Sequence, residues 1–241
     1  MNDALETIAQ IASLKELRLA DNALSGELSS SIGGLTELET LEVQGNKLSS
    51  LPDELGSLGH LKALNLSNNQ ILSLPMAEIS KLPLTHLFAS KNKLSGTLLD
   101  QNDVSMSRLQ VLDVSINSLT LLSAGTVTLP SLKEINIAFN RLSSLPDISS
   151  WTSLSGLLAE DNSITELPKG FTKLPHLRTA DFTGNDFPRL DPKIGSMQSL
   201  ESIKFAANPI RERKFLTMGT AELKRDLRAR LGLDAPGQEL D

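Results

Sequence analysis

The chain has 241 residues, and its 29 acidic and 23 basic side chains give a net charge of −6. It contains no cysteine, which excludes disulfide-bonded caps, thiol nucleophiles and cysteine metal ligands. No apolar run approaches the roughly 20 residues that a membrane-spanning helix needs, and the first residues lack the pattern of a signal peptide.

The first segment, residues 4–14, carries apolar residues three apart at Ile8, Ile11 and Leu14. The same spacing recurs in residues 55–61, within the second half of a repeating unit. We therefore expect the chain to begin in the middle of a repeat, without an N-terminal cap. Because stacked repeats need polar caps, this favours a fragment of a longer repeat protein over a partner that covers the first repeat.

A repeated pattern, L-x-x-L-x-L-x-x-N-x-L, occurs nine times between Leu14 and Ile210. Its asparagines lie 22 to 25 residues apart and are Asn22, Asn46, Asn69, Asn92, Asn117, Asn140, Asn162, Asn185 and Asn208. So regular a period is typical of one supersecondary unit stacked on the next. The pattern resembles leucine-rich repeats, and it predicts an α/β solenoid (a horseshoe) of nine repeats over residues 1–210, with a parallel sheet on the concave side.

Each position of the repeat has a physical role. Leu64 and Leu66 are two residues apart, so both side chains point to the same, inward face of a short strand. Asn69 follows the strand, where its amide can donate to and accept from backbone groups of the adjacent coil. We therefore expect the nine asparagines to form a structural ladder through the stack.

The second half of each repeat varies more than the first. Several of these segments begin with Leu-Pro, and proline favours a tight start to a short segment on the convex side. They are too short for full helices, so we expect short helical turns or extended pieces. Trp151 stands where other repeats have leucine, and we expect it in the core.

The repeat ends after Ile210, and residues 211–232 are expected to form a C-terminal cap with a helix. Thr220 is the expected N-cap of that helix. Leu223, Leu227 and Leu231 lie four residues apart and would cover the last repeat. Residues 233–241 are expected to be a flexible tail.

The cap is rich in basic residues. Residues 204–230 contain eight lysines or arginines against three acids, a local charge of +5. Such a cluster is also found in nucleic-acid-binding surfaces. We favour a solvated face of the capping helix, and expect no nucleic-acid partner.

At the level of family, the alternation of this pattern with L-P-x-x-L-x-x-L segments resembles the intracellular Ras-group leucine-rich-repeat proteins. The ending Asn208-Pro-Ile-Arg, followed by Gly219-Thr220, is similar to the C-terminal cap of a member of that group. The resemblance implies a non-catalytic scaffold or adaptor in the cytoplasm or nucleus, often in signalling. The absence of cysteine also favours a reducing, intracellular location.

Function is expected in the variable strand positions that face outward on the concave side. Nine strands about 4.8 Å apart would form a groove roughly 38 Å long. In the central repeats, apolar and acidic residues occupy these positions, and the candidate partner-binding set is Phe88, Val111, Asp113, Leu158, Glu160 and Asp181. An apolar anchor surrounded by charge is typical of interface hot spots, although single exposed apolar residues are also common. We give Phe139 less weight, because the position before the ladder asparagine is often partly buried.

No catalytic, cofactor or metal-binding pattern is present, so we expect neither an enzyme nor a small-molecule substrate. The favoured hypothesis is a scaffold that binds a protein partner, of unknown identity, on the concave face. The alternative is a recognition or regulatory domain of a larger multidomain protein.

Overall fold

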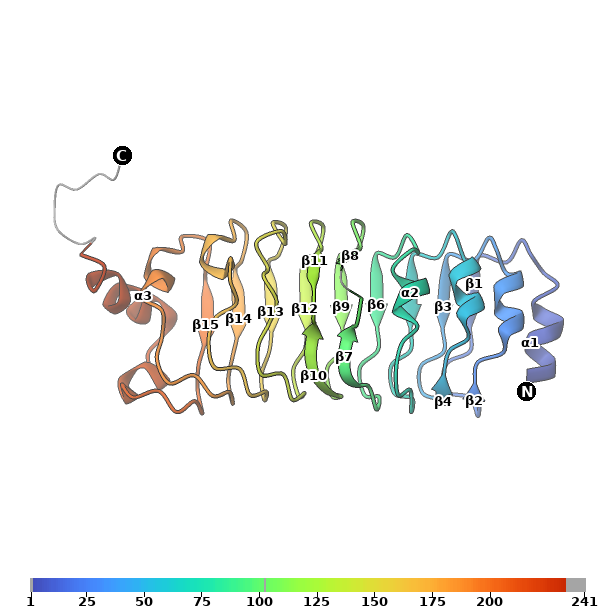
Figure 1. The fold of residues 1–241 in the computed structure, drawn as a ribbon, viewed down its shortest axis with the longest axis horizontal. Coiled ribbons are helices and arrows are strands. Elements are labelled where there is room, and N and C mark those ends of the chain that lie inside the picture. Colours follow the sequence, from blue (N-terminus) through green and yellow to red (C-terminus); the bar gives the residue numbers. More distant parts are fainter. Residues whose placement is uncertain (1, 102, 233–241) are drawn as a thin grey trace.

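The computed structural model describes residues 2–101 and 103–232. Within them the chain forms a row of similar coils, stacked side by side in sequence order from the N-terminal to the C-terminal end (Figure 1). Each coil contributes one short strand to a common sheet and returns along the opposite side.

One parallel sheet runs the length of the stack, and its neighbouring strands follow the order of the sequence. The described residues give it nine strands: β1 (Glu16–Arg18), β3 (Thr40–Glu42), β5 (Ala63–Asn65), β6 (His86–Phe88), β9 (Val111–Asp113), β12 (Glu134–Asn136), β13 (Gly156–Leu158), β14 (Thr179–Asp181) and β15 (Ser202–Lys204). In each strand the middle residue is buried, while at least one flanking residue reaches the outer face. The predicted solenoid with a parallel sheet is confirmed.

The opposite side of the coils holds short helices near both ends of the stack. They are α1 (Asn2–Ile8), η1 (Ser30–Gly34), η2 (Asp53–Ser57), α2 (Met76–Ile79), η3 (Phe171–Lys173) and η4 (Pro192–Ser196), where η denotes a 3-10 helix. Pro52 and Pro75 are the N-caps of η2 and α2. Pro192 is the first residue of η4, a position that its fixed φ suits.

Extended segments that pair in parallel precede η1 and η2 in the first coils and form the returning side of the central coils. These are β2 (Ser25–Glu27) with β4 (Lys47–Ser50), β7 (Ser95–Leu99) with β10 (Ser118–Ser123), and β8 (Asp103–Ser105) with β11 (Thr126–Thr128). The mixture of helical turns and extended pieces agrees with the sequence prediction.

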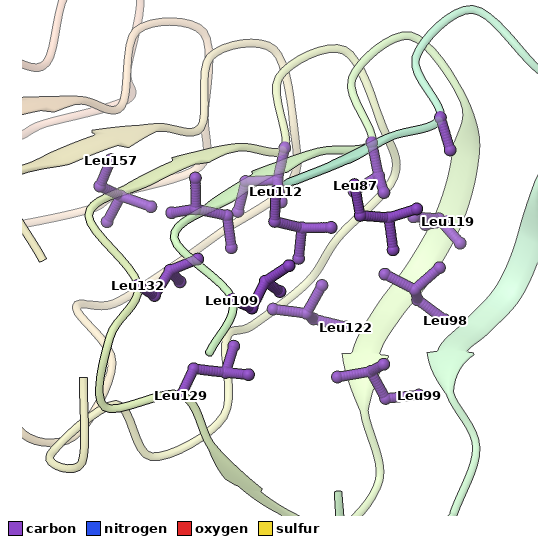
Figure 2. Packing of buried hydrophobic residues seen from close by; sticks show 14 of the residues in the cluster. Leu87, Leu98, Leu99, Leu109, Leu112, Leu119, Leu122, Leu129, Leu132 and Leu157 are labelled. Atoms are coloured by element: carbon purple, nitrogen blue, oxygen red, sulfur yellow. The ribbon is translucent and has the colours of Figure 1, made fainter. Parts of the chain in front are cut away.

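The core is a continuous column of leucines between the sheet and the returning segments. Figure 2 shows part of it, where Leu112 from the sheet and Leu122 from β10 both point into the interior. Trp151 is fully buried, as predicted, and its indole N–H donates to the carbonyl of Val127 at 3.2 Å.

The asparagine ladder connects each coil to the one before it. Asn117 Oδ1 accepts the backbone N–H of Leu94 at 3.0 Å. Its Nδ2 donates to the carbonyl of Ala89 in the preceding coil and to that of Val114 in its own, both at 3.0 Å. The first asparagine differs, because Asn22 is exposed and donates to the carbonyls of Leu19 and Ala20 in its own coil.

At the C-terminal end, η5 (Arg213–Leu216) and α3 (Thr220–Ala229) cover the last coil. Leu223 and Leu227 are buried against it. The expectation for Leu231 is wrong: it lies beyond the end of α3 and is 36% exposed.

Thr220 does not cap α3 either. Gly219 is the N-cap, and Thr220 Oγ1 accepts the backbone N–H of Ile203 at 3.0 Å. The strand β15 is the last of the sheet, so this N–H has no further strand to pair with, and the hydroxyl satisfies it instead. The expected tail, residues 233–241, lies outside the described residues.

Candidate protein-binding face

The outer face of the sheet is hollowed at its centre. The hollow has a volume of about 480 Å³ and spans the strands from β6 to β14. Its lining is Phe88, Val111, Leu112, Asp113, Glu134, Ile135, Asn136, Ser155, Gly156, Leu158, Arg178, Thr179 and Glu201. The lining therefore combines apolar side chains with both signs of charge.

The hollow exists because side-chain size changes along one row of the sheet. Strand pairing places Val111, Glu134, Gly156 and Thr179 side by side. Gly156 has no side chain, and a Cβ there would meet only Thr179 Oγ1 at 3.5 Å and Glu134 Cγ at 3.7 Å. The space is therefore open to a group from outside. The sequence analysis did not single out Gly156.

Four of the six predicted residues line this hollow: Phe88, Val111, Asp113 and Leu158. Phe88 is half-buried beside His86, with 6.0 Å between ring centroids. Leu158 is 39% exposed, so much of its apolar surface remains in solvent. Within the described residues, the structure thus joins side chains that lie up to 70 positions apart in the chain.

Asp113 is held in a fixed orientation at the edge of the hollow. Its Oδ1 accepts the backbone N–H of Ser115 at 2.9 Å and the hydroxyl of the same serine at 2.7 Å. The carboxylate is therefore positioned before any partner arrives, which lowers the entropy that binding must remove.

The other two predicted residues, Glu160 and Asp181, lie outside the lining of the hollow. Asp181 is buried, forms an ion pair with Lys204 at 2.9 Å and accepts the backbone N–H of Thr183 at 3.0 Å. Burial alone would raise the pKa of Asp181, but the hydrogen bonds from Lys204 and Thr183 hold it below its ordinary value. Its charge is already satisfied within the chain.

Glu160 has the opposite character. Burial raises the pKa of its carboxyl group, and the neighbouring Asp181 adds to the increase. Within the described residues, its buried Oε2 has no hydrogen-bond partner. One of the two carboxyl oxygens of Glu160 therefore lacks a donor, although its own backbone N–H partly offsets the increase in pKa.

The sequence analysis undervalued the rim of the sheet, by which we mean the residues that directly precede the ladder asparagines. Phe139 is 54% exposed, so the expectation that this position is partly buried is wrong for it, and Ile116 in the adjacent coil is 44% exposed. All nine rim residues have a positive φ, which turns the chain out of the sheet: Asp21, Gly45, Asn68, Lys91, Ile116, Phe139, Asp161, Gly184 and Ala207. An apolar pair among these polar or small residues was the signal available in the sequence.

Three basic residues of the cap are engaged within the chain. Lys214 pairs with Asp226, and Arg230 pairs with both Asp226 and Glu212. Lys224 donates to the carbonyl of Leu200 at 2.9 Å, and burial lowers its pKa. These contacts reduce the positive field that the composition of the segment suggests.

No helix within residues 2–101 and 103–232 has the length and apolar character needed to cross a bilayer. Over the same ranges, no group of three or more histidines and acids is arranged to hold a metal ion.

Comparison with known proteins places the fold. A family model described as "Leucine rich repeat" matches residues 36–94, and a second with the same description matches residues 13–35. The solved structure of the plant peptide hormone receptor RGFR1 in complex with RGF2 is similar over 84% of this chain and 33% of that one, with 25% identity and a TM-score of 0.66. YopM from Yersinia enterocolitica covers 83% of this chain and 39% of its own, with 27% identity and a TM-score of 0.63.

The chain is a leucine-rich-repeat solenoid. Human Toll-like receptor 1 is 29% identical to it over 203 residues, which are 83% of this chain and 23% of the receptor. Mouse leucine-rich repeat serine/threonine-protein kinase 1 is 29% identical over 210 residues, which are 82% of this chain and 10% of the kinase. The solenoid therefore spans less than a quarter of either relative.

Proposed function

We propose that this solenoid is a non-catalytic protein-interaction module that binds a protein partner in the central hollow of its concave sheet. The observation that carries the proposal is the hollow itself, where Phe88, Val111 and Leu158 expose apolar surface around the space left by Gly156. Apolar pockets surrounded by polar groups are where interface hot spots concentrate. The fold supports this use, because leucine-rich repeats commonly serve as interaction modules.

The charges around the hollow indicate what the partner carries. Asp113, Glu134 and Glu201 line it, against one base, Arg178. We therefore expect an aliphatic or aromatic side chain of the partner in the hollow, flanked by lysine or arginine.

A capture experiment tests the site. The wild-type chain, a Phe88→Ala/Leu158→Ala variant and a Thr40→Ala/Glu42→Ala control would be immobilised, after circular dichroism has shown that all three are folded. The control removes side chains from β3, on the same face but away from the hollow. We expect the wild type and the control to retain a common set of proteins from cell extract that the hollow variant loses. Retention of the same set by all three would refute the site.

The alternative is that the solenoid is the recognition or regulatory domain of a larger protein. The support for this is that it matches only 10% of a kinase and 23% of a receptor. The coding sequence on either side of this segment distinguishes the two: further repeats favour the scaffold, and an enzyme or receptor domain favours the alternative.

We further infer a Ras-group type, an intracellular location and a role in signalling. The Leu-Pro segments and the ending Asn208-Pro-Ile-Arg support the group, since this ending is similar to the cap of leucine-rich repeat-containing protein 40. The absence of cysteine supports a reducing location. Fractionation of cells that express the tagged full-length protein tests it, and recovery in the secreted fraction would overturn it.

A further inference from the structure

The rim carries a short row of residues that the binding hollow does not use. The row consists of Lys91, Ile116, Phe139 and Asp161, one from each of four consecutive coils. Direct hydrogen bonds join these coils at the rim: the N–H groups of Lys91, Ile116 and Phe139 donate to carbonyls of the next coil at 3.0, 2.9 and 2.8 Å. At about 4.8 Å per coil, the row is roughly 14 Å long.

The two apolar members contribute little to folding for their size. Ile116 and Phe139 are 44% and 54% exposed. Both have a left-handed backbone, with φ of +54° and +56°, a conformation that bulky and especially β-branched residues disfavour. Where a residue is both strained and exposed, an external contact is a physical reason for its presence.

The sequence of charges along the row is self-complementary. It is positive, apolar, apolar, negative, so a second copy turned by 180° presents negative, apolar, apolar, positive. Lys91 then faces Asp161 of the second copy, and Ile116 faces its Phe139. The described residues give Lys91 and Asp161 no salt bridge within one chain, so both charges are open to such pairing.

The rows on either side of the rim row fit the same two-fold symmetry. In the row of residues that directly precede the rim residues, Ser90 would face Glu160 of the second copy and Ser115 would face its Ala138. On the other side, Lys93 would face Ser163 and Ser118 would face Arg141. No like charges oppose one another, as the self-complementary patch of an isologous two-fold contact requires.

We propose that this rim row is a homodimer interface, with a two-fold axis that passes between Ile116 and Phe139. The inference does not depend on the binding hollow, because the row uses none of the residues that line it. Since the row is short, the dimer is expected to be weak and to dissociate on dilution and at high salt.

Sedimentation velocity over a range of protein concentrations tests the proposal. We expect the wild type to shift from monomer to dimer as its concentration rises. Lys91→Glu makes both ends of the row negative and Asp161→Lys makes both positive, so each variant alone should dimerise at least about tenfold more weakly. Mixing the two should restore a dimer, because each now complements the other.

The controls keep the result interpretable. Asp21→Lys changes the charge at the equivalent rim position of the first coil, outside the row, and should dimerise as the wild type does. Ile116→Asn/Phe139→Asn should remain folded by circular dichroism, because asparagine tolerates a positive φ, and should be monomeric. A wild type that stays monomeric at every concentration would overturn the proposal, as would a dimer that Lys91→Glu leaves unchanged or a mixture that fails to associate.

Discussion

The interior of the coils and the outer face of the sheet are built from alternate residues of the same strands, yet they follow different rules. Inside, nearly every coil repeats the one before it, with a leucine or its substitute in each slot and an asparagine on the ladder. Outside, neighbouring coils carry Phe88, Asp113, Asn136 and Leu158 in one row. The interior is constrained by stacking, whereas the outer face is free to vary and therefore to carry function.

The interior and the outer face should differ most in how much stability is lost when an aromatic side chain is truncated. Trp151→Ala removes a fully buried ring and its hydrogen bond to Val127, and should lower the free energy of unfolding by about 3–5 kcal/mol. Urea denaturation measures it. Phe88→Ala, on the outer face, is the matched control and should lower it by less than about 1.5 kcal/mol. Equal losses would remove the distinction between interior and face.

The ladder offers a smaller test within the interior. Asn117→Ala leaves the buried N–H of Leu94 without its acceptor and removes one of the two amide donors to the carbonyl of Ala89. It should lower the free energy of unfolding by about 1–3 kcal/mol. Asn22→Ala, at the exposed first position, should have a clearly smaller effect. Similar effects at the two sites would show that the hydrogen bonds between coils add nothing to the stability of the fold.

Two acids in adjacent coils, Asp181 and Glu160, should affect the pH dependence of stability in opposite ways. The lowered pKa of Asp181 means that its ion pair with Lys204 contributes stability above the unfolded pKa of about 3.9, and that this contribution is lost as the pH falls through the folded value. The raised pKa of Lys204 keeps the contribution present at neutral pH. Thermal melting of Asp181→Asn should therefore lie below that of the wild type at pH 7, with the gap closing in strong acid. A gap that does not depend on pH would contradict the ion pair.

Replacing Glu160 should change the melting temperature in the opposite direction, and by the smallest amount. Its pKa is raised, so its ionised form destabilises the fold above the unfolded pKa of about 4.3. Glu160→Gln should therefore raise the melting temperature slightly at pH 7 and leave it unchanged in acid. A decrease at pH 7 would mean that contacts within the chain outweigh the cost of burying the carboxylate.

The contrast between interior and outer face also explains which features could be predicted from the sequence. The strands, the core and the ladder were predictable because one pattern repeats, so each coil confirms the assignment of the next. Thr220 was assigned wrongly because a helix N-cap and an acceptor for the last strand's free N–H use the same residue type. The residue preference at helix N-caps could not show that β15, as the last strand, leaves the N–H of Ile203 without a strand partner.

The outer face was only partly predictable. Phe88, Val111, Asp113 and Leu158 could be found because they occupy outward positions of known register. Gly156 escaped notice because the hollow depends on a side chain that is absent. Asp181 seemed available until the structure showed its pairing with Lys204 from the next strand.

The most direct test of the central claim is site-specific photo-crosslinking from the hollow. A photoreactive phenylalanine analogue would replace Phe88 in one preparation and Leu72 in another. Leu72 is 58% exposed but lies outside the sheet strands. The same photoreactive group is therefore presented to solvent there, but away from the hollow. We predict that the analogue at position 88 links covalently to a partner protein in cell extract and that the analogue at position 72 does not. Crosslinks from position 72 alone would contradict the account and place binding on another side of the solenoid.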